Sequence, residues 1–158
     1  MSNANTSRDP SINDLDQAPS GRLLSLDLGE KRVGVAVSDE SLIAVRPLPL
    51  LRRTSWKELV RAVRELVLSF DAKGLVIGLP LNLDGTEGSA AGDARRRARN
   101  FHQSLNLPVY LQDERLTTRE AEQSLRAAGA TAPEVRQRAD SEAAVIILRD
   151  FIVQHGSR

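Results

Sequence analysis

The order of apolar and polar positions divides the chain into a polar start and a series of short alternating elements. Residues 1–20 are rich in Ser, Asn, Asp and Pro and show almost no apolar periodicity, which is typical of a disordered tail. From Arg22, two apolar runs flank a glycine-containing turn at 28–30, which predicts a β-hairpin. A third extended run at 42–53 contains two prolines, which cannot donate ladder hydrogen bonds, so this strand should lie at a sheet edge.

Helical spacing begins after this third strand. The Ser-x-x-Glu spacing from Ser55 to Glu58 is that of a capping box, and apolar residues follow at helical intervals to Phe70. The uninterrupted apolar run at 74–80 predicts a strand covered on both faces, in the middle of a sheet. A polar, glycine-rich loop at 82–93 should then lead into a helix with the buried stripe Ala94, Ala98, Phe101 and Leu105.

The last third of the chain continues the alternation. Residues 107–112 read as a fifth strand, and Thr-x-x-Glu spacings at 117–120 and 131–134 predict two further helices, the second running to about Gln154. Three strands followed by helix, strand, helix, strand and helix predict an α/β fold with helices on both faces of the sheet. We expect a single domain at 21–156, preceded by the tail.

Composition excludes several classes of chemistry. The chain has no cysteine, so disulfides, thiolate metal sites and cysteine nucleophiles are excluded. No apolar run approaches the roughly 20 residues that span a bilayer, and no secretion signal opens the chain, so we expect a cytoplasmic protein with no membrane partner. The formal net charge is only +1, so an argument for a nucleic-acid partner must rest on where the basic residues lie.

Asp27 is an acidic residue within an apolar strand, where an ionised carboxylate is costly unless a cation or hydrogen-bond donors offset it. It is either a metal ligand held at the middle of the sheet or a structural residue satisfied by the turn amides around Gly29. Glu114 follows the fifth strand, at the end where open α/β sheets gather ligands. It is either a second ligand or a carboxylate that complements the dipole of the next helix. Asp113 should point the other way, since strand side chains alternate.

Asp140 shares a helical face with Ala144, Ile147, Leu148 and Phe151, so its carboxylate is expected on the core side. The alternative is an N-cap that follows a helix break near Arg138. Three carboxylates brought together would repel one another unless a cation lay between them. Magnesium or manganese prefers such hard oxygen ligands, and two ions about 4 Å apart can promote phosphodiester hydrolysis. The inventory therefore favours a site for Mg²⁺ or Mn²⁺ at Asp27, Glu114 and Asp140.

Four segments together resemble the YqgF-type nucleases, the RuvC-like branch of the RNase H superfamily, described as Holliday junction resolvases and as nucleases that mature the small-subunit rRNA precursor. The segments are LDLGEKRVGVAVSD at 26–39, VIGLPLNLDGTEG at 76–88, DERLTT at 113–118 and DSEAAVIIL at 140–148. The resemblance implies an RNase H-like fold with a five-stranded mixed sheet, three antiparallel strands and then two parallel ones. It also implies a metal-dependent nuclease whose acidic positions are Asp27, Glu114 and Asp140. RuvC-like relatives place their second acid on the fourth strand, where this chain has none, so Glu114 must substitute from one strand away.

Basic residues near these acids are candidate phosphate contacts, although each could equally be an ordinary solvated charge. They are Lys31, Arg32, Arg115, Arg136 and Arg138, and the arginines at 95–99 could extend the track. The loop at 82–93 could form a mobile flap at the mouth of the site. A resolvase that makes two symmetric cuts should be a homodimer, whereas an RNA-processing enzyme could be a monomer.

Two other functions compete with a nuclease. The Asp-x-Gly-x-x-x-x-Gly pattern at 27–34 also resembles the phosphate-binding turn of actin-like and sugar kinases, but those proteins close a second lobe over the nucleotide, and 158 residues leave no room for one. The other possibility is a nucleic-acid-binding module that kept the fold and lost turnover. The presence of all three acids argues against this loss.

Overall fold

The computed structural model describes residues 19–114, 127, 129 and 132–156, with the side chains of 132–141 outside the description. One sheet has the order β3-β2-β1-β4-β5. Its strands are β1 (Leu23–Leu28), β2 (Arg32–Ser38), β3 (Val45–Arg52), β4 (Gly74–Leu79) and β5 (Val109–Asp113). The first three pair antiparallel and β1, β4 and β5 pair parallel, which confirms the predicted mixed sheet. The predicted tail and the helix expected after 117 fall almost entirely outside the described residues.

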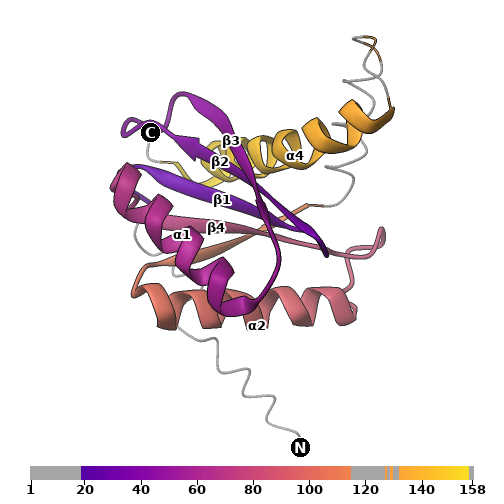
Figure 1. Ribbon diagram of the computed structural model, residues 1–158, viewed down its shortest axis with the longest axis horizontal. Coiled ribbons are helices and arrows are strands. Elements are labelled where there is room, and N and C mark those ends of the chain that lie inside the picture. The colour runs from indigo at the N-terminus through magenta and orange to yellow at the C-terminus, as the bar shows by residue number, and fades with distance from the viewer. Residues whose placement is uncertain (1–18, 115–126, 128, 130–131, 157–158) are drawn as a thin grey trace, which may run out of the picture.

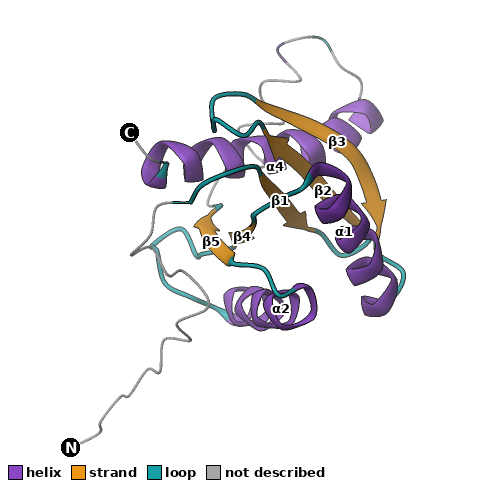
Figure 2. Cartoon of the chain, turned by 90° about the vertical axis from the view of Figure 1, so that its left-hand side faces the viewer, coloured by secondary structure: helices purple, strands orange, loops and turns teal. Residues whose placement is uncertain are grey.

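In the described part of the chain, the helices that cover the sheet are α1 (Trp56–Phe70), α2 (Ser89–Leu105) and α4 (Ala132–His155). Helices α1 and α2 lie on one face of the sheet, and α4 crosses the other (Figures 1 and 2). The proline-containing strand β3 is at the edge, as predicted, and the wholly buried β4 lies between β1 and β5. None of the helices in the described part of the chain is long and apolar enough to cross a membrane.

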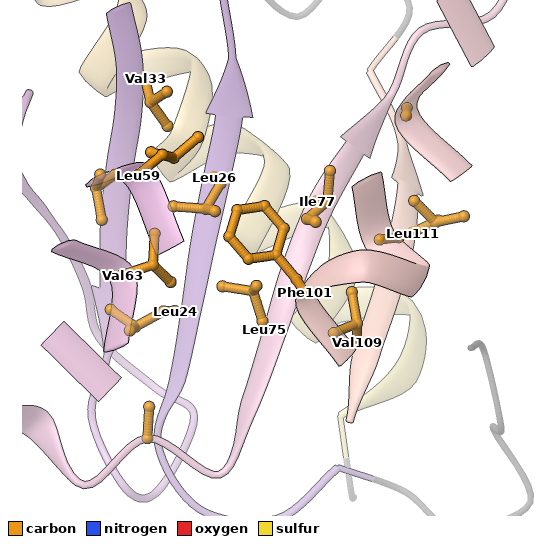
Figure 3. Close-up of a cluster of buried hydrophobic side chains, with 14 of the residues drawn as sticks. Leu24, Leu26, Val33, Leu59, Val63, Leu75, Ile77, Phe101, Val109 and Leu111 are labelled. Carbon is orange, nitrogen blue, oxygen red and sulfur yellow. The ribbon is translucent and has the colours of Figure 1, made fainter. Parts of the chain in front are cut away.

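The core between the sheet and the α1–α2 layer contains alternate residues of each central strand. Leu24 and Leu26 of β1 belong to it, together with Phe101 of α2, which is completely buried. Figure 3 shows the Phe101 ring lying among side chains of β1 and β4. Its centroid is 4.6 Å from that of Trp56, so the same ring joins α1 to α2. The predicted Ser55 cap is present, with Ser55 Oγ accepting from the Glu58 amide at 3.2 Å.

The opposite face of the sheet packs against α4. Leu23 of β1 lies there with Ala144, Leu148 and Phe151, and the Ser25 hydroxyl donates to the Ala144 carbonyl at 2.7 Å. A hydroxyl can reach the helix backbone because alanine at 144 lets α4 approach the sheet closely. Odd-numbered residues of β1 therefore face α4, and this alternation places Asp27 on the same side.

The structure corrects the start of α2 and excludes one interpretation of Asp140. Helix α2 begins at Ser89 rather than near residue 94, so the loop predicted at 82–93 is shorter. Glycine and small residues suggested a loop by composition, but Ala91 is fully buried and extends the apolar stripe by one turn. Helix α4 runs unbroken through position 140, which makes the predicted alternative of an N-cap after a break wrong.

Candidate active site

Asp27 lies near the carboxyl end of the central strand and is partly buried. Its neighbour across the antiparallel pair is Gly34, and no side chain there covers it. The Gly29 amide donates to the main-chain carbonyls of Asp27, at 3.1 Å, and Arg32, at 3.0 Å. The Gly29 amide therefore bonds to the hairpin backbone rather than to the Asp27 carboxylate.

Glu114 follows β5 and continues its pairing by one residue, because its amide donates to the Leu79 carbonyl at 3.1 Å. Gln112, two residues earlier, faces α4 and donates to Gln154 at 3.4 Å. Alternation therefore places Glu114 on the α4 face as well, and Asp113 on the other, in agreement with the expectation from the sequence.

Gly78 of β4 brings Glu114 within reach of Asp27. A Cβ atom added at Gly78 would lie 2.8 Å from the Glu114 Cδ and 2.9 Å from the Ile147 Cδ1 of α4. The Glu114 side chain therefore leans from the end of β5 over β4, the strand between β5 and β1. The carboxyl group of a residue that follows the fifth strand thus lies above the fourth strand, the strand on which the RuvC-like pattern predicts an acid.

The two carboxyl groups meet above β4. Burial, the charge of Asp27 and a hydrogen bond to Asp27 raise the pKa of Glu114 to about 8, with a smaller contribution from Asp113. At neutral pH without a cation, the pair therefore retains a proton, since two adjacent carboxylates cannot both ionise cheaply. Mg²⁺ and Mn²⁺ prefer oxygen ligands, and a divalent cation would offset the negative charge of this carboxylate pair when both groups are ionised. The residues present fit a divalent metal.

Position 140 lies in α4, four residues before Ala144, the residue whose carbonyl binds Ser25. The Asp140 side chain is outside the described residues, so its part in the site stays a prediction. Within the described ranges the structure brings together two of the three predicted acids, and no group of three candidate metal ligands is found there.

The predicted phosphate contacts are only partly described. Lys31 and Arg32 are exposed at the turn that follows β1 and at the start of β2. Arg115 and the side chains of Arg136 and Arg138 lie outside the described residues. In the stretch at 95–99, two arginines pair with nearby acids of the chain itself: Arg95 with Glu87 at 2.5 Å, and Arg96 with Asp93.

Two residues of the site were missed from the sequence. Gly78 carried a signal, because a glycine inside a buried strand often marks a close approach by another group. Arg53 carried none: its Nη1 donates to the Gly29 carbonyl at 2.7 Å and supports the turn after Asp27 from the end of β3. That contact joins residues 24 positions apart and depends on the sheet register.

Replacing Gly78 with alanine is expected to destabilise the protein by about 1–3 kcal/mol, since the new methyl group overlaps the Glu114 carboxyl group and the Ile147 side chain. It should also reduce cleavage by displacing Glu114 from Asp27. Urea unfolding and a cleavage assay measure the two effects. The matched control is Gly92→Ala, since a Cβ at Gly92 meets nothing within 4 Å. Equal behaviour of the two variants would contradict the close approach.

The raised pKa of Glu114 predicts how stability depends on pH without metal. Between the ordinary value of 4.5 and about 8, folded Glu114 holds a proton that the unfolded chain has released. The free energy of unfolding should therefore fall as pH rises through this window, by at most about 1.4 kcal/mol per pH unit from this group. Urea unfolding in chelator should show a steeper fall for the wild type than for Glu114→Gln. Parallel pH profiles would contradict the burial of this carboxyl group beside Asp27.

The sheet and helices define the class of the protein, an RNase H-like fold of the RuvC type. The chain superposes on Thermus thermophilus RuvC, solved in complex with a Holliday junction substrate, with a TM-score of 0.53 and 17% identity over 87% of this chain and 97% of that one. At this identity the match establishes the fold alone.

Sequence comparison establishes the family. The protein-family model described as "RuvX: Holliday junction resolvase" matches residues 21–154. The chain therefore belongs to this family of nucleases, which hydrolyse phosphodiester bonds. A relative from Anaeromyxobacter sp. (strain K) is 43% identical, covering 83% of this chain and 96% of its own. One from Lactobacillus acidophilus is 39% identical, covering 85% and 97%. Both carry the name "Putative pre-16S rRNA nuclease".

Proposed function

We propose that this protein is a divalent-metal-dependent nuclease that processes the precursor of 16S rRNA, with Asp27, Glu114 and Asp140 as metal ligands. The observation that carries the proposal is the meeting of the Asp27 and Glu114 carboxyl groups at the carboxyl ends of the central strands. The choice of RNA rests on the name shared by relatives that are 39–43% identical over most of their length.

The fold contributes rigidity to this site. Asp27 is held by its pairing with Gly34 on a strand that has neighbours on both sides. Glu114 is held by the bond from its amide to the Leu79 carbonyl, and its side chain packs over Gly78. Rigid carboxylates bind a cation without a further ordering cost. When bound, divalent cations supply Lewis acids that stabilise negative charge on phosphate oxygens and favour attack by water.

Basic side chains would orient the phosphodiester for in-line attack. Lys31 and Arg32 border the turn that follows Asp27, and Arg115 adjoins Glu114 in the sequence. We assign this orienting role to Lys31, Arg32, Arg115, Arg136 and Arg138. Holding the scissile phosphate in a reactive position accounts for a large share of catalysis in reactions of this kind.

The test offers the purified protein labelled rRNA precursor, single-stranded RNA and DNA, and four-way DNA junctions, each with Mg²⁺, Mn²⁺ or chelator. Cleavage of the RNA precursor with metal and none in chelator is the expected result. Cleavage that persists in chelator would overturn the metal dependence.

The family description gives a second candidate, cleavage of Holliday junctions. A resolvase places two symmetric cuts and should act as a homodimer, so preferential cleavage of junctions by a dimer would favour it. Binding of nucleic acid without cleavage of any substrate would identify a non-catalytic module instead.

A further inference from the structure

Arg53 and Arg97 form a pair of neighbouring guanidinium groups beside the turn that follows Asp27. Arg53 lies between β3 and α1 and donates to the Gly29 carbonyl at 2.7 Å. Arg97 lies on α2, with its guanidinium 5.7 Å from the Trp56 ring centroid and 24% of its side chain exposed. Burial and the neighbouring charges of Arg53 and Arg96 lower the pKa of Arg97, against an opposing effect of Asp93. The two cations are therefore close enough to repel each other.

Neutral groups of the protein provide much of the support for these arginines. A main-chain carbonyl holds Arg53 and an indole ring supports Arg97, and such contacts position a guanidinium without neutralising it. Asp93 is 3.8 Å from Arg97 but also pairs with Arg96, so it balances only part of this charge. Arg53 makes no ion pair with any carboxylate in the described part of the chain. An anion placed between the two guanidinium groups would relieve their repulsion.

Further basic residues lie near Arg53 in the strands and in the turn. Arg32 and Arg52 face each other across β2 and β3, and the Arg53 amide donates to the Lys31 carbonyl at 3.0 Å. The acids nearest in sequence are Glu30, which is exposed in the turn, and Glu58, which accepts a hydrogen bond from Thr54. Lys31, Arg32, Arg52 and Arg53 therefore lie together at the end of the sheet where β1 and β3 finish, although the whole chain has a net charge of only +1.

This end of the sheet is also the end that carries the candidate active site. Gly29, the residue that Arg53 contacts, donates its amide to the Asp27 carbonyl at 3.1 Å. Arg53 and Arg97 belong to the α1–α2 side of the sheet, whereas the Asp27 carboxylate faces α4. A nucleic-acid backbone that runs along this end of the sheet could therefore place one phosphate at the carboxylates and another at the arginines.

We propose that Arg53 and Arg97 bind a phosphate of the nucleic-acid backbone that flanks the scissile phosphodiester. This inference rests on the proposed nuclease function and extends its substrate contacts to the opposite side of the sheet. The chemistry recognised is the phosphodiester that RNA and DNA share. Guanidinium groups suit it because their donors match phosphate oxygens in pairs.

Equilibrium binding in chelator tests the proposal separately from catalysis, because it requires no turnover. Duplex RNA and duplex DNA of equal length are titrated at several salt concentrations with wild type, Arg53→Gln, Arg97→Gln and the double variant. Each single variant should weaken binding several-fold and lower the slope of log affinity against log salt by about 0.9, the loss of about one phosphate contact. Arg53→Lys and Arg97→Lys should recover most of the slope because they keep the charge.

Arg64→Gln is the matched control, since Arg64 also donates to a backbone carbonyl, that of Ser104 at 3.0 Å near the end of α2. It should leave the salt slope unchanged. Arg97→Gln retains the Arg53–Gly29 bond, so it tests the proposal even if Arg53→Gln unfolds. The proposal would be overturned if Arg53→Gln and Arg97→Gln showed the same salt slope as Arg64→Gln with both RNA and DNA. A loss confined to one polymer would also overturn it, because the contact would then be to sugar or base.

Discussion

Replacing Asp27 with asparagine is expected to lower the cleavage rate by about 10²-fold or more, with metal present and the fold retained. Asparagine has nearly the same shape but no charge, so it weakens a metal ligand without opening a cavity. Rates measured over a range of Mn²⁺ concentrations are the appropriate assay, since a weakened ligand also raises the metal concentration needed for activity. Activity equal to that of the wild type at every concentration would contradict the role of Asp27.

The same substitution, Asp27→Asn, should not lower the stability of the protein, although it lowers the cleavage rate. Without metal the Asp27 charge acts against ionisation of Glu114, so removing it should leave the free energy of unfolding at neutral pH equal to or above that of the wild type. If Asp27 instead served to support the turn, its loss would cost about 1–3 kcal/mol. Urea unfolding in chelator separates these outcomes, and a clear loss of stability would favour the structural role.

Replacing Phe101 with alanine is expected to destabilise the protein by about 3–5 kcal/mol. The ring is fully buried, lies among side chains of β1 and β4, and packs on Trp56, so its removal leaves a cavity that joins α2, α1 and the sheet. Thermal or urea unfolding gives the measurement, and the midpoint temperature should fall by about 10 °C or more.

Leu68→Ala on α1 is the control for Phe101→Ala, since Leu68 is also apolar but 73% exposed. Its effect should stay within about 0.5 kcal/mol. Similar losses for the two variants would show that the layer between the sheet and α2 is not the main core of the protein.

The sequence predicted the sheet well because its strands differ in pattern. The prolines at 47 and 49 indicated an edge, and the apolar run at 74–80 indicated a covered central strand, both of which the structure confirms. The start of α2 was missed because Gly88 and Gly92 outweighed the burial of Ala91. Residue type indicates helix propensity, whereas burial depends on what packs against the helix.

In the candidate site, too, the residue types could be selected from the sequence but the contacts between them could not. Asp27 and Glu114 could be selected because carboxylates near strand ends in an apolar context need an explanation. The way in which Glu114 reaches Asp27 could not be predicted from the sequence. It depends on Gly78 of β4, the strand between β5 and β1, because glycine has no side chain to block Glu114. The contact between Arg53 and Gly29 depends likewise on the register of β2 and β3.

Divalent-metal binding is the most direct test of the central claim, that Asp27 and Glu114 form one cation site. The measurement is the change in unfolding free energy of wild type, Asp27→Asn and Glu114→Gln when Mn²⁺ is added at neutral pH. Binding to the folded state alone should stabilise the wild type, by about 2.7 kcal/mol at a hundredfold excess over the Kd, and both variants much less. Equal stabilisation of all three proteins would contradict the account, since the cation would then bind elsewhere.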